Sequence, residues 1–163
     1  MDDQIEGFTL NCQGHRLDIS FYLKSITTAL SKTINRIYLA RFWMDANQFN
    51  TVVKASSQCK ELVFSLLSLK LNSDLDFSIE TSYKLELIDF KNSGLSDRSD
   101  WKSNSGNFDS IIKAISKSGL KNSLKKIGIK ACEIELDHAM DVLNKNGINH
   151  VAVTLDEADP FPI

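Results

Sequence analysis

A recurring apolar pattern constrains the fold of this chain more than any other feature of its sequence. The pattern is apolar-x-x-apolar-x-apolar-x-x-small/apolar-x-apolar, and the region from 124 to 134 gives the clearest copy, with Leu124, Ile127, Ile129, Cys132 and Ile134. The copies begin at residues 5, 34, 59, 85, 124 and 148, so that successive starts are 29, 25, 26, 39 and 24 residues apart. Such self-similarity is the signature of repeat architectures, in which each unit buries its apolar side against the next.

Each copy predicts a strand followed by a helix. Residues two apart, such as Ile127 and Ile129, point to one face of a strand, while Lys126 and Lys130 point to the other. Helical spacing then follows in the first, second, fourth and fifth copies. The residues that carry it are Tyr22, Leu23, Ile26, Ala29 and Leu30; Phe49, Val52 and Val53; Phe108, Ile111, Ile112 and Ile115; and Leu136, Ala139, Met140 and Leu143.

Local signals indicate where these helices begin and end. Asp45 with Gln48 three residues later has the spacing of a capping box, which predicts a helix start. Gly119 and Gly147 mark the ends of the helices of the fourth and fifth copies. The third copy predicts only a weak helix over 76–82, and the polar stretch 96–107 is expected to be a loop inserted in the fourth copy.

The third copy allows two registers. One runs through Cys59, Leu62, Phe64, Leu67 and Leu69, and the other runs through Phe64, Leu67, Leu69 and Asn72. The second register would place an asparagine at the corner that follows the strand, whereas the first keeps the spacing of the neighbouring copies. The pattern alone leaves both open.

The set of copies resembles a leucine-rich repeat protein of the ribonuclease-inhibitor-like kind, with degenerate repeats. Cys132 stands where that family carries Asn or Cys at the corner. The resemblance implies an α/β leucine-rich-repeat half-solenoid with a parallel sheet on the concave side and helices on the convex side. Residues 1–155 would form one domain of about six irregular βα units, followed by an acidic, proline-containing tail at 156–163. An open doubly wound α/β domain is the alternative that the same alternation allows.

Composition argues against several function classes. With 163 residues, a net charge of −2 and a pI of about 5.9, the chain gives no global attraction to nucleic acid or to anionic lipid. Its longest apolar runs, such as 62–71, are interrupted by Ser and Lys and stay short of the ~20 residues of a membrane helix. Three widely spaced cysteines fit a reducing compartment, so a cytoplasmic protein without disulfides is expected.

The sequence carries no catalytic or nucleotide-binding motif that we recognise, so no enzyme, cofactor or metal site is expected. Glu135 and His138 form an E-x-x-H spacing, but the second such motif and the further carboxylates of a di-iron site are missing. Cys132 and Cys59 sit at apolar positions of the pattern, where a free cysteine serves as a small hydrophobic side chain.

A non-enzymatic protein-protein interaction module, or a scaffold subunit of a larger assembly, is therefore the expected function. Solenoids bind extended partners on the exposed side of their strands. Lysines 113, 117 and 121 share one helix face and are interpreted as solvated. The alternative is a small open α/β enzyme or ligand-binding domain with a site near Asp45, Ser93 and Glu133. The residues expected to bind a protein partner are Arg36, Tyr38, Arg41, Asp89, Lys91, Lys126 and Lys130, together with Trp101 in the polar loop; Glu61 and His150 are placed on the same exposed side.

Overall fold

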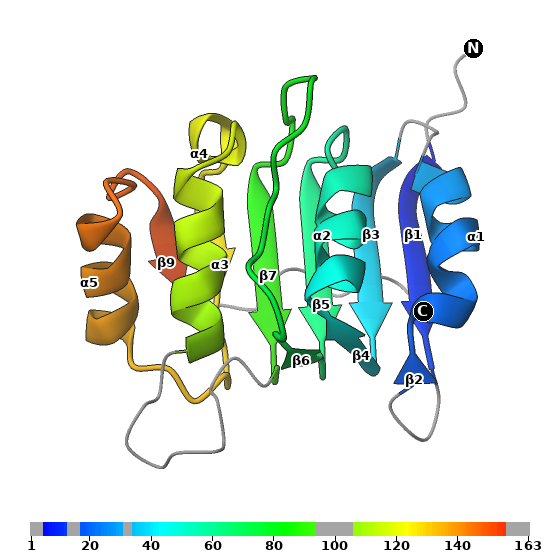
Figure 1. Cartoon of the computed structure of the whole chain (residues 1–163), viewed down its shortest axis with the longest axis horizontal. Coiled ribbons are helices and arrows are strands. Elements are labelled where there is room, and N and C mark those ends of the chain that lie inside the picture. Colours follow the sequence, from blue (N-terminus) through cyan, green and yellow to red (C-terminus); the bar gives the residue numbers. More distant parts are fainter. Residues whose placement is uncertain (1–4, 13–16, 31–33, 94–105, 156–163) are drawn as a thin grey trace.

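Six parallel strands form the main sheet, and their order in the sheet is their order in the chain. The computed structural model describes residues 5–12, 17–30, 34–93 and 106–155 (Figure 1). Within this part of the chain each strand pairs with the next one along the sequence, and the order is β1-β3-β5-β7-β8-β9. The strands are β1 (Ile5–Asn11), β3 (Ile34–Ala40), β5 (Glu61–Ser65), β7 (Leu87–Lys91), β8 (Lys126–Gly128) and β9 (Ala152–Thr154).

A second, smaller parallel sheet follows the carboxyl ends of the first strands. It contains β2 (Leu17–Asp18), β4 (Phe42–Asp45) and β6 (Ser68–Lys70), in the order β2-β4-β6. Met44 pairs with Leu69 in this sheet, and both side chains are buried. These are the last apolar positions of the second and third copies of the pattern, so the pattern runs through two sheets rather than one.

The main helices lie against one face of the six-stranded sheet (Figure 1). They are α1 (Ser20–Leu30), α2 (Ala46–Ala55), α3 (Gly106–Ser116) and α5 (Leu136–Lys145), and the short α4 (Leu120–Ser123) follows α3. The strand order contains no reversal, whereas a doubly wound sheet reverses its order and carries helices on both faces. The molecule is thus an α/β protein with a parallel sheet covered by its helices on one side.

The apolar pattern lines up from strand to strand. Ile37 pairs with Leu62, Leu62 with Ile88, and Ile88 with Ile127, and each of these side chains is at most 1 % exposed. The next inward row holds Phe64 and Phe90, whose rings stack with centroids 5.5 Å apart. Phe49 of α2 lies 5.5 Å from Phe64 and 6.5 Å from Phe90, which ties this helix to two strands.

The pairing resolves the register of the third copy. Leu62 and Phe64 of β5 lie opposite Ile37 and Leu39 of β3. The copy therefore starts at Cys59, and Asn72 does not occupy the corner position.

The start of α2 and the end of α5 agree with the local sequence signals, whereas Gly119 precedes α4 and does not end α3, which closes at Ser116. Asp45 accepts a hydrogen bond from the Gln48 backbone N–H at 2.8 Å, and the Gln48 side chain accepts one from the Asp45 N–H at 2.8 Å, which completes the predicted capping box. Gly147 ends α5 in the left-handed conformation, with φ of 71°. The loop expected over 96–107 is shorter at its end, because α3 already begins at Gly106; residues 96–105, with Trp101, lie outside the described residues, as does the tail 156–163.

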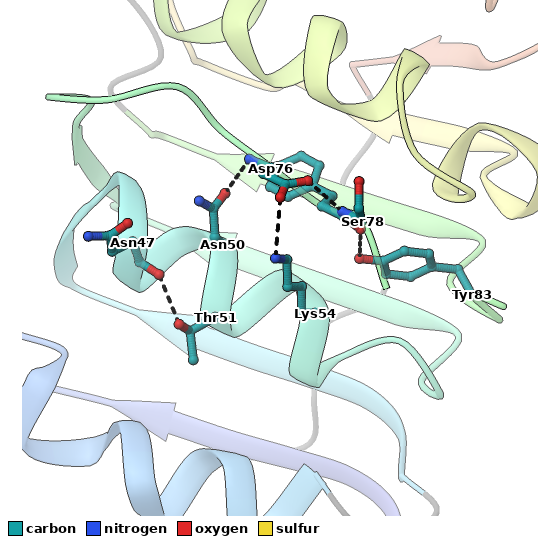
Figure 2. Close-up of polar contacts among 8 residues, drawn as sticks. Asn47, Asn50, Thr51, Lys54, Asp76, Ser78 and Tyr83 are labelled. Atoms are coloured by element: carbon teal, nitrogen blue, oxygen red, sulfur yellow. Dashed lines mark hydrogen bonds and ion pairs between the residues drawn. The ribbon is translucent and has the colours of Figure 1, made fainter. Parts of the chain in front are cut away.

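The third unit differs from the prediction, because it has no helix over 76–82. This stretch is extended and is fastened to α2 by polar contacts (Figure 2). The Asp76 N–H donates to Asn50 Oδ1 at 3.0 Å, and the Asp76 carboxylate lies 3.8 Å from Lys54 Nζ. Tyr83 donates its hydroxyl to the Phe77 carbonyl at 2.6 Å, and the Phe77 ring is buried against Phe49. Phe77 thus supplies a buried ring to the core although the segment that carries it is not helical.

The sixth unit is displaced by two residues from the predicted register. Ile127 pairs with Val153, not with Val151. The cause lies at the end of α5, where the N–H groups of Gly147 and Ile148 donate to the carbonyls of Asn144 and Leu143 in a Schellman arrangement. Ile148 therefore belongs to the helix cap rather than to the approach of the strand.

Candidate partner-binding face

The strand residues that alternate with the core residues form the open face, which is the side of the main sheet opposite the helices. Its first row runs from Arg36 through Glu61 and Leu87 to Lys126, each paired with the next. Arg36 and Glu61 form an ion pair between adjacent strands, with side chains 21 % and 32 % exposed. Because the pair is partly solvated, it contributes little to stability and mainly fixes the position of the two side chains.

The middle row of the open face is largely withdrawn from solvent. It contains Tyr38, Val63, Asp89 and Gly128 in consecutive strands. Val63 is 2 % exposed and Asp89 is 1 % exposed, so Asp89 lies on the expected face but is buried instead of exposed. The absence of a side chain at Gly128 makes this possible, because a Cβ at that position would stand 2.1 Å from Asp89 Oδ1.

The third row lies at the carboxyl ends of the strands and contains Ala40, Ser65, Lys91 and Lys130. The first three are paired in β3, β5 and β7. The Leu66 N–H donates to the Lys91 carbonyl at 2.9 Å, and the Asn92 N–H donates to the Lys130 carbonyl at 3.0 Å. Lys130 therefore stands beside Lys91 although it follows the end of β8.

Three lysines make one end of the open face basic. Lys91 is partly exposed, and Lys126 and Lys130 are exposed. They lie on β7 and at or just after β8, on the side of the sheet that ends in β9. The structure thus brings together three of the residues that the pattern assigned to a partner.

Other predicted residues lie elsewhere. Arg41 follows β3 at the corner between the two sheets, with φ of 65°, so it stands at the rim of the open face. His150 is not on the face, because the displaced register leaves it before β9, where its Nε2 lies 2.8 Å from the Lys121 carbonyl. Trp101 lies outside the described residues.

The carboxyl ends of the strands, where an α/β enzyme would carry its site, use their polar groups for structure. The Asp45 carboxylate caps α2, and the Gln48 amide also donates to Asp18 Oδ1 at 2.8 Å. Ser93 is 3 % exposed, and its hydroxyl accepts the Leu67 N–H at 3.1 Å and donates to the Lys91 carbonyl at 3.0 Å. Glu133 is exposed and has φ of 58°. The side chains of Asp45 and Ser93 are therefore held by hydrogen bonds with backbone groups.

The described cysteines are buried thiols. Cys132 is 2 % exposed and donates to the Phe90 carbonyl, with 2.8 Å between sulfur and oxygen. Burial raises the pKa of Cys132 and that of Cys59 to about 11, and it also raises the pKa of Cys12. Thiols of this kind stay protonated at neutral pH and are poor nucleophiles.

One histidine pairs with a carboxylate between two helices. His138 Nε2 of α5 lies 3.4 Å from Asp109 Oδ1 of α3, and both side chains are partly exposed. Among the described residues no group of three or more His, Cys, Asp or Glu side chains could hold a metal ion.

Comparison with known proteins gives no relative for this chain. No family model, no curated protein and no solved structure matches it. Among the described helices, none is long and apolar enough to cross a membrane.

Proposed function

We propose that this protein is a leucine-rich-repeat-like interaction module without enzymatic activity, and that it binds a protein partner on the open face of its sheet. Arg36, Tyr38, Lys91, Lys126 and Lys130 would contact the partner, with Arg41 at the rim. The observation that carries the proposal is the basic open face of a parallel sheet whose strands follow one another in chain order.

The corners between units support the repeat interpretation. Arg41, Leu66, Asn92 and Ala131 occupy equivalent corners, and their φ angles are 65°, 54°, 47° and 54°. The N–H groups of the first three donate to the next unit's strand end at 2.9, 2.9 and 3.0 Å. Equivalent residues that repeat one backbone conformation and one hydrogen bond are what stacked copies of a single unit require.

The side chains after these corners also join neighbouring units. Ser93 accepts the Leu67 N–H of the preceding unit, and Cys132 donates to the Phe90 carbonyl of the preceding unit. Both residues occupy the corner position of the repeat pattern. In the proposed architecture they do what the corner Asn or Cys of the resembled family is expected to do.

The open face suits a protein partner better than a small ligand. Arginine and tyrosine are enriched among the residues that dominate binding energy at protein interfaces. The strand carboxyl ends favour no second function, because Asp45 and Ser93 are engaged with the backbone.

Affinity capture with charge-reversed baits tests the proposal. The wild-type chain, a K126E/K130E variant and a K113E/K117E variant are immobilised and exposed to a native extract of cells that express the protein, and bound proteins are identified by mass spectrometry. Lys113 and Lys117 are exposed on or just after α3, so the second variant makes the same charge change on the helical side. We expect partners that the wild type and K113E/K117E retain and that K126E/K130E loses at least 10-fold.

Circular dichroism must be the same for all three baits, because the exposed lysines do not contribute to the core. If K126E/K130E retains its fold and captures the same proteins as the wild type, the open face is not the binding surface.

A further inference from the structure

We propose that the acidic segment 156–163 of this chain binds its own open face, across Lys91, Lys126 and Lys130, and so competes with the partner. The inference rests on the proposed function and adds the chemistry of the ligand, which is an extended acidic peptide. Its basis is the charge of the open face, the burial of three of its side chains and the distance that the segment can span.

The charges are complementary and adjacent. The segment reads Asp156, Glu157, Ala158, Asp159, Pro160, Phe161, Pro162, Ile163. One residue, Leu155, separates the segment from the end of β9, and the Ile129 N–H donates to the Thr154 carbonyl at 3.0 Å, so the segment starts close to the strand end that carries Lys130. Three acidic residues within four positions thus begin one strand away from the basic end of the open face.

The segment is long enough to cross this face. Eight residues span at most about 26–29 Å when extended. Neighbouring strands lie about 4.8 Å apart, so β3 lies roughly 19 Å from β9. Pro160 and Pro162 have no N–H groups and favour an extended chain, which fits a segment that crosses the strands instead of pairing with β9.

The burial of the open face fits an occupant. Ala40, Val63 and Asp89 are 3 %, 2 % and 1 % exposed, although the described helices lie on the opposite face (Figure 1). Exposed sheet faces normally keep such positions in contact with water. These three side chains lie in consecutive strands, along the path from β7 to β3.

A peptide-binding experiment tests the inference. The probe is a fluorescein-labelled peptide of residues 155–163 (LDEADPFPI), and its binding to the full chain is followed by fluorescence anisotropy. The hosts are the wild type and a D156N/E157Q/D159N variant, whose own segment has lost its charge. We expect the peptide to bind the neutralised variant at least 10-fold more tightly than the wild type, because the wild-type segment occupies the face.

Two charge reversals on the host locate the site, and two further controls test the sequence specificity and the electrostatic origin of binding. Adding K126E/K130E to the neutralised variant should abolish peptide binding, whereas adding K113E/K117E should leave it within 2-fold. A peptide of the same composition in scrambled order should bind more weakly, and 1 M salt should weaken the specific complex, because the Debye length is then only about 3 Å.

Equal peptide affinity for the wild type and the neutralised variant would overturn the inference, as would peptide binding that K126E/K130E leaves intact. Partner capture that still depends on Lys126 and Lys130 would then show that the proposed function stands without the intramolecular ligand. A neutralised variant that forms a dimer in size-exclusion chromatography without the peptide, and a monomer once K126E/K130E is added, would assign the face to a second copy of the chain and also overturn the inference.

Discussion

At the scale of single residues, the corners between strands show how two small side chains, a hydroxyl and a thiol, serve the fold. Cys132 and Ser93 are small enough to turn inward at a corner and polar enough to satisfy a neighbouring backbone group. A buried backbone N–H or carbonyl without a partner would cost roughly 1–3 kcal/mol. These residues are therefore parts of the scaffold, and their chemistry is hydrogen bonding.

The buried thiols predict a loss of stability at alkaline pH. Burial raises the pKa of Cys59 and Cys132 to about 11 from an ordinary value of 9.0. Between pH 9 and 11 the unfolded chain releases thiol protons that the folded chain keeps, so the free energy of unfolding falls as pH rises. At 1.36 kcal/mol per pKa unit, each thiol accounts for roughly 2–3 kcal/mol by pH 11.

Urea unfolding of the wild type and a Cys59→Ala variant at pH 8 and pH 11 measures this effect. The variant lacks one titrating thiol, so the stability gap between the two proteins should be smaller at pH 11 than at pH 8. A gap of the same size at both pH values would show that the Cys59 thiol does not titrate differently in the folded protein.

The sequence predicted the buried thiols but not the backbone at the corners. Cys59 and Cys132 stand at apolar positions of a repeating pattern, which is enough to place them in the core. The left-handed conformation of Arg41, Leu66 and Ala131 carries no such signal, because L-residues adopt it at a cost and glycine is its usual marker. At Arg41 and Leu66 this conformation accompanies the backbone hydrogen bond that the corners repeat.

At the scale of elements, the position of α2 follows from a local capping signal and from the packing of one of its side chains on the sheet. The capping box of α2 joins the end of β4 to the start of the helix without a loop, because Asp45 is both the last strand residue and the helix cap. Phe49, one turn into α2, then reaches the rings of two strands. The cap therefore sets the position of a core ring.

Removing the cap should destabilise the protein by about 1 kcal/mol. In an Asp45→Ala variant the Gln48 N–H loses its acceptor, and such substitutions cost roughly 0.5–2 kcal/mol. Asn47→Ala is the matched control, because Asn47 is an exposed residue of the same helix whose side chain caps nothing. Chemical denaturation should separate the two variants.

Similar stabilities of the Asp45→Ala and Asn47→Ala variants would mean that the capping box does not hold α2 in place.

The third unit has no helix over 76–82 because tertiary contacts, which the apolar pattern does not contain, decide its conformation. Residues 76–82 contain helical spacing of only moderate strength, and tertiary contacts decide the outcome. Phe77 inserts into the core, Tyr83 closes the segment by bonding the Phe77 carbonyl, and Asn50 holds the Asp76 N–H (Figure 2). An extended chain places one ring deep in the core, and no local rule predicts this choice.

At the scale of the whole molecule, the sequence predicts the order of the strands better than it predicts the surface. The period placed Ile37, Leu62, Ile88 and Ile127 in equivalent positions, and the sheet pairs them in that order. The surface depends on neighbours: the Asp89 side chain can lie where it does only because Gly128 has no side chain. A two-residue shift in the last unit likewise removed His150 from the open face.

The strand alignment also explains why the basic end of the open face is a property of the whole fold. Lys91 and Lys130 are 39 positions apart in the sequence and become neighbours only when the fourth and fifth units are in register. A change of register in either unit would separate them, so the proposed partner site depends on the stacking of the units.

The most direct test of this account is a methyl NOESY spectrum of a sample labelled at Ile, Leu and Val methyl groups. Side chains on adjacent strands lie about 5 Å apart, well within the range of the experiment. The account predicts a continuous chain of cross-peaks from Ile37 to Leu62, from Leu62 to Ile88, and from Ile88 to Ile127. Cross-peaks that instead join these methyl groups in another order, such as Ile37 directly to Ile127, would contradict the strand order and the open face that depends on it.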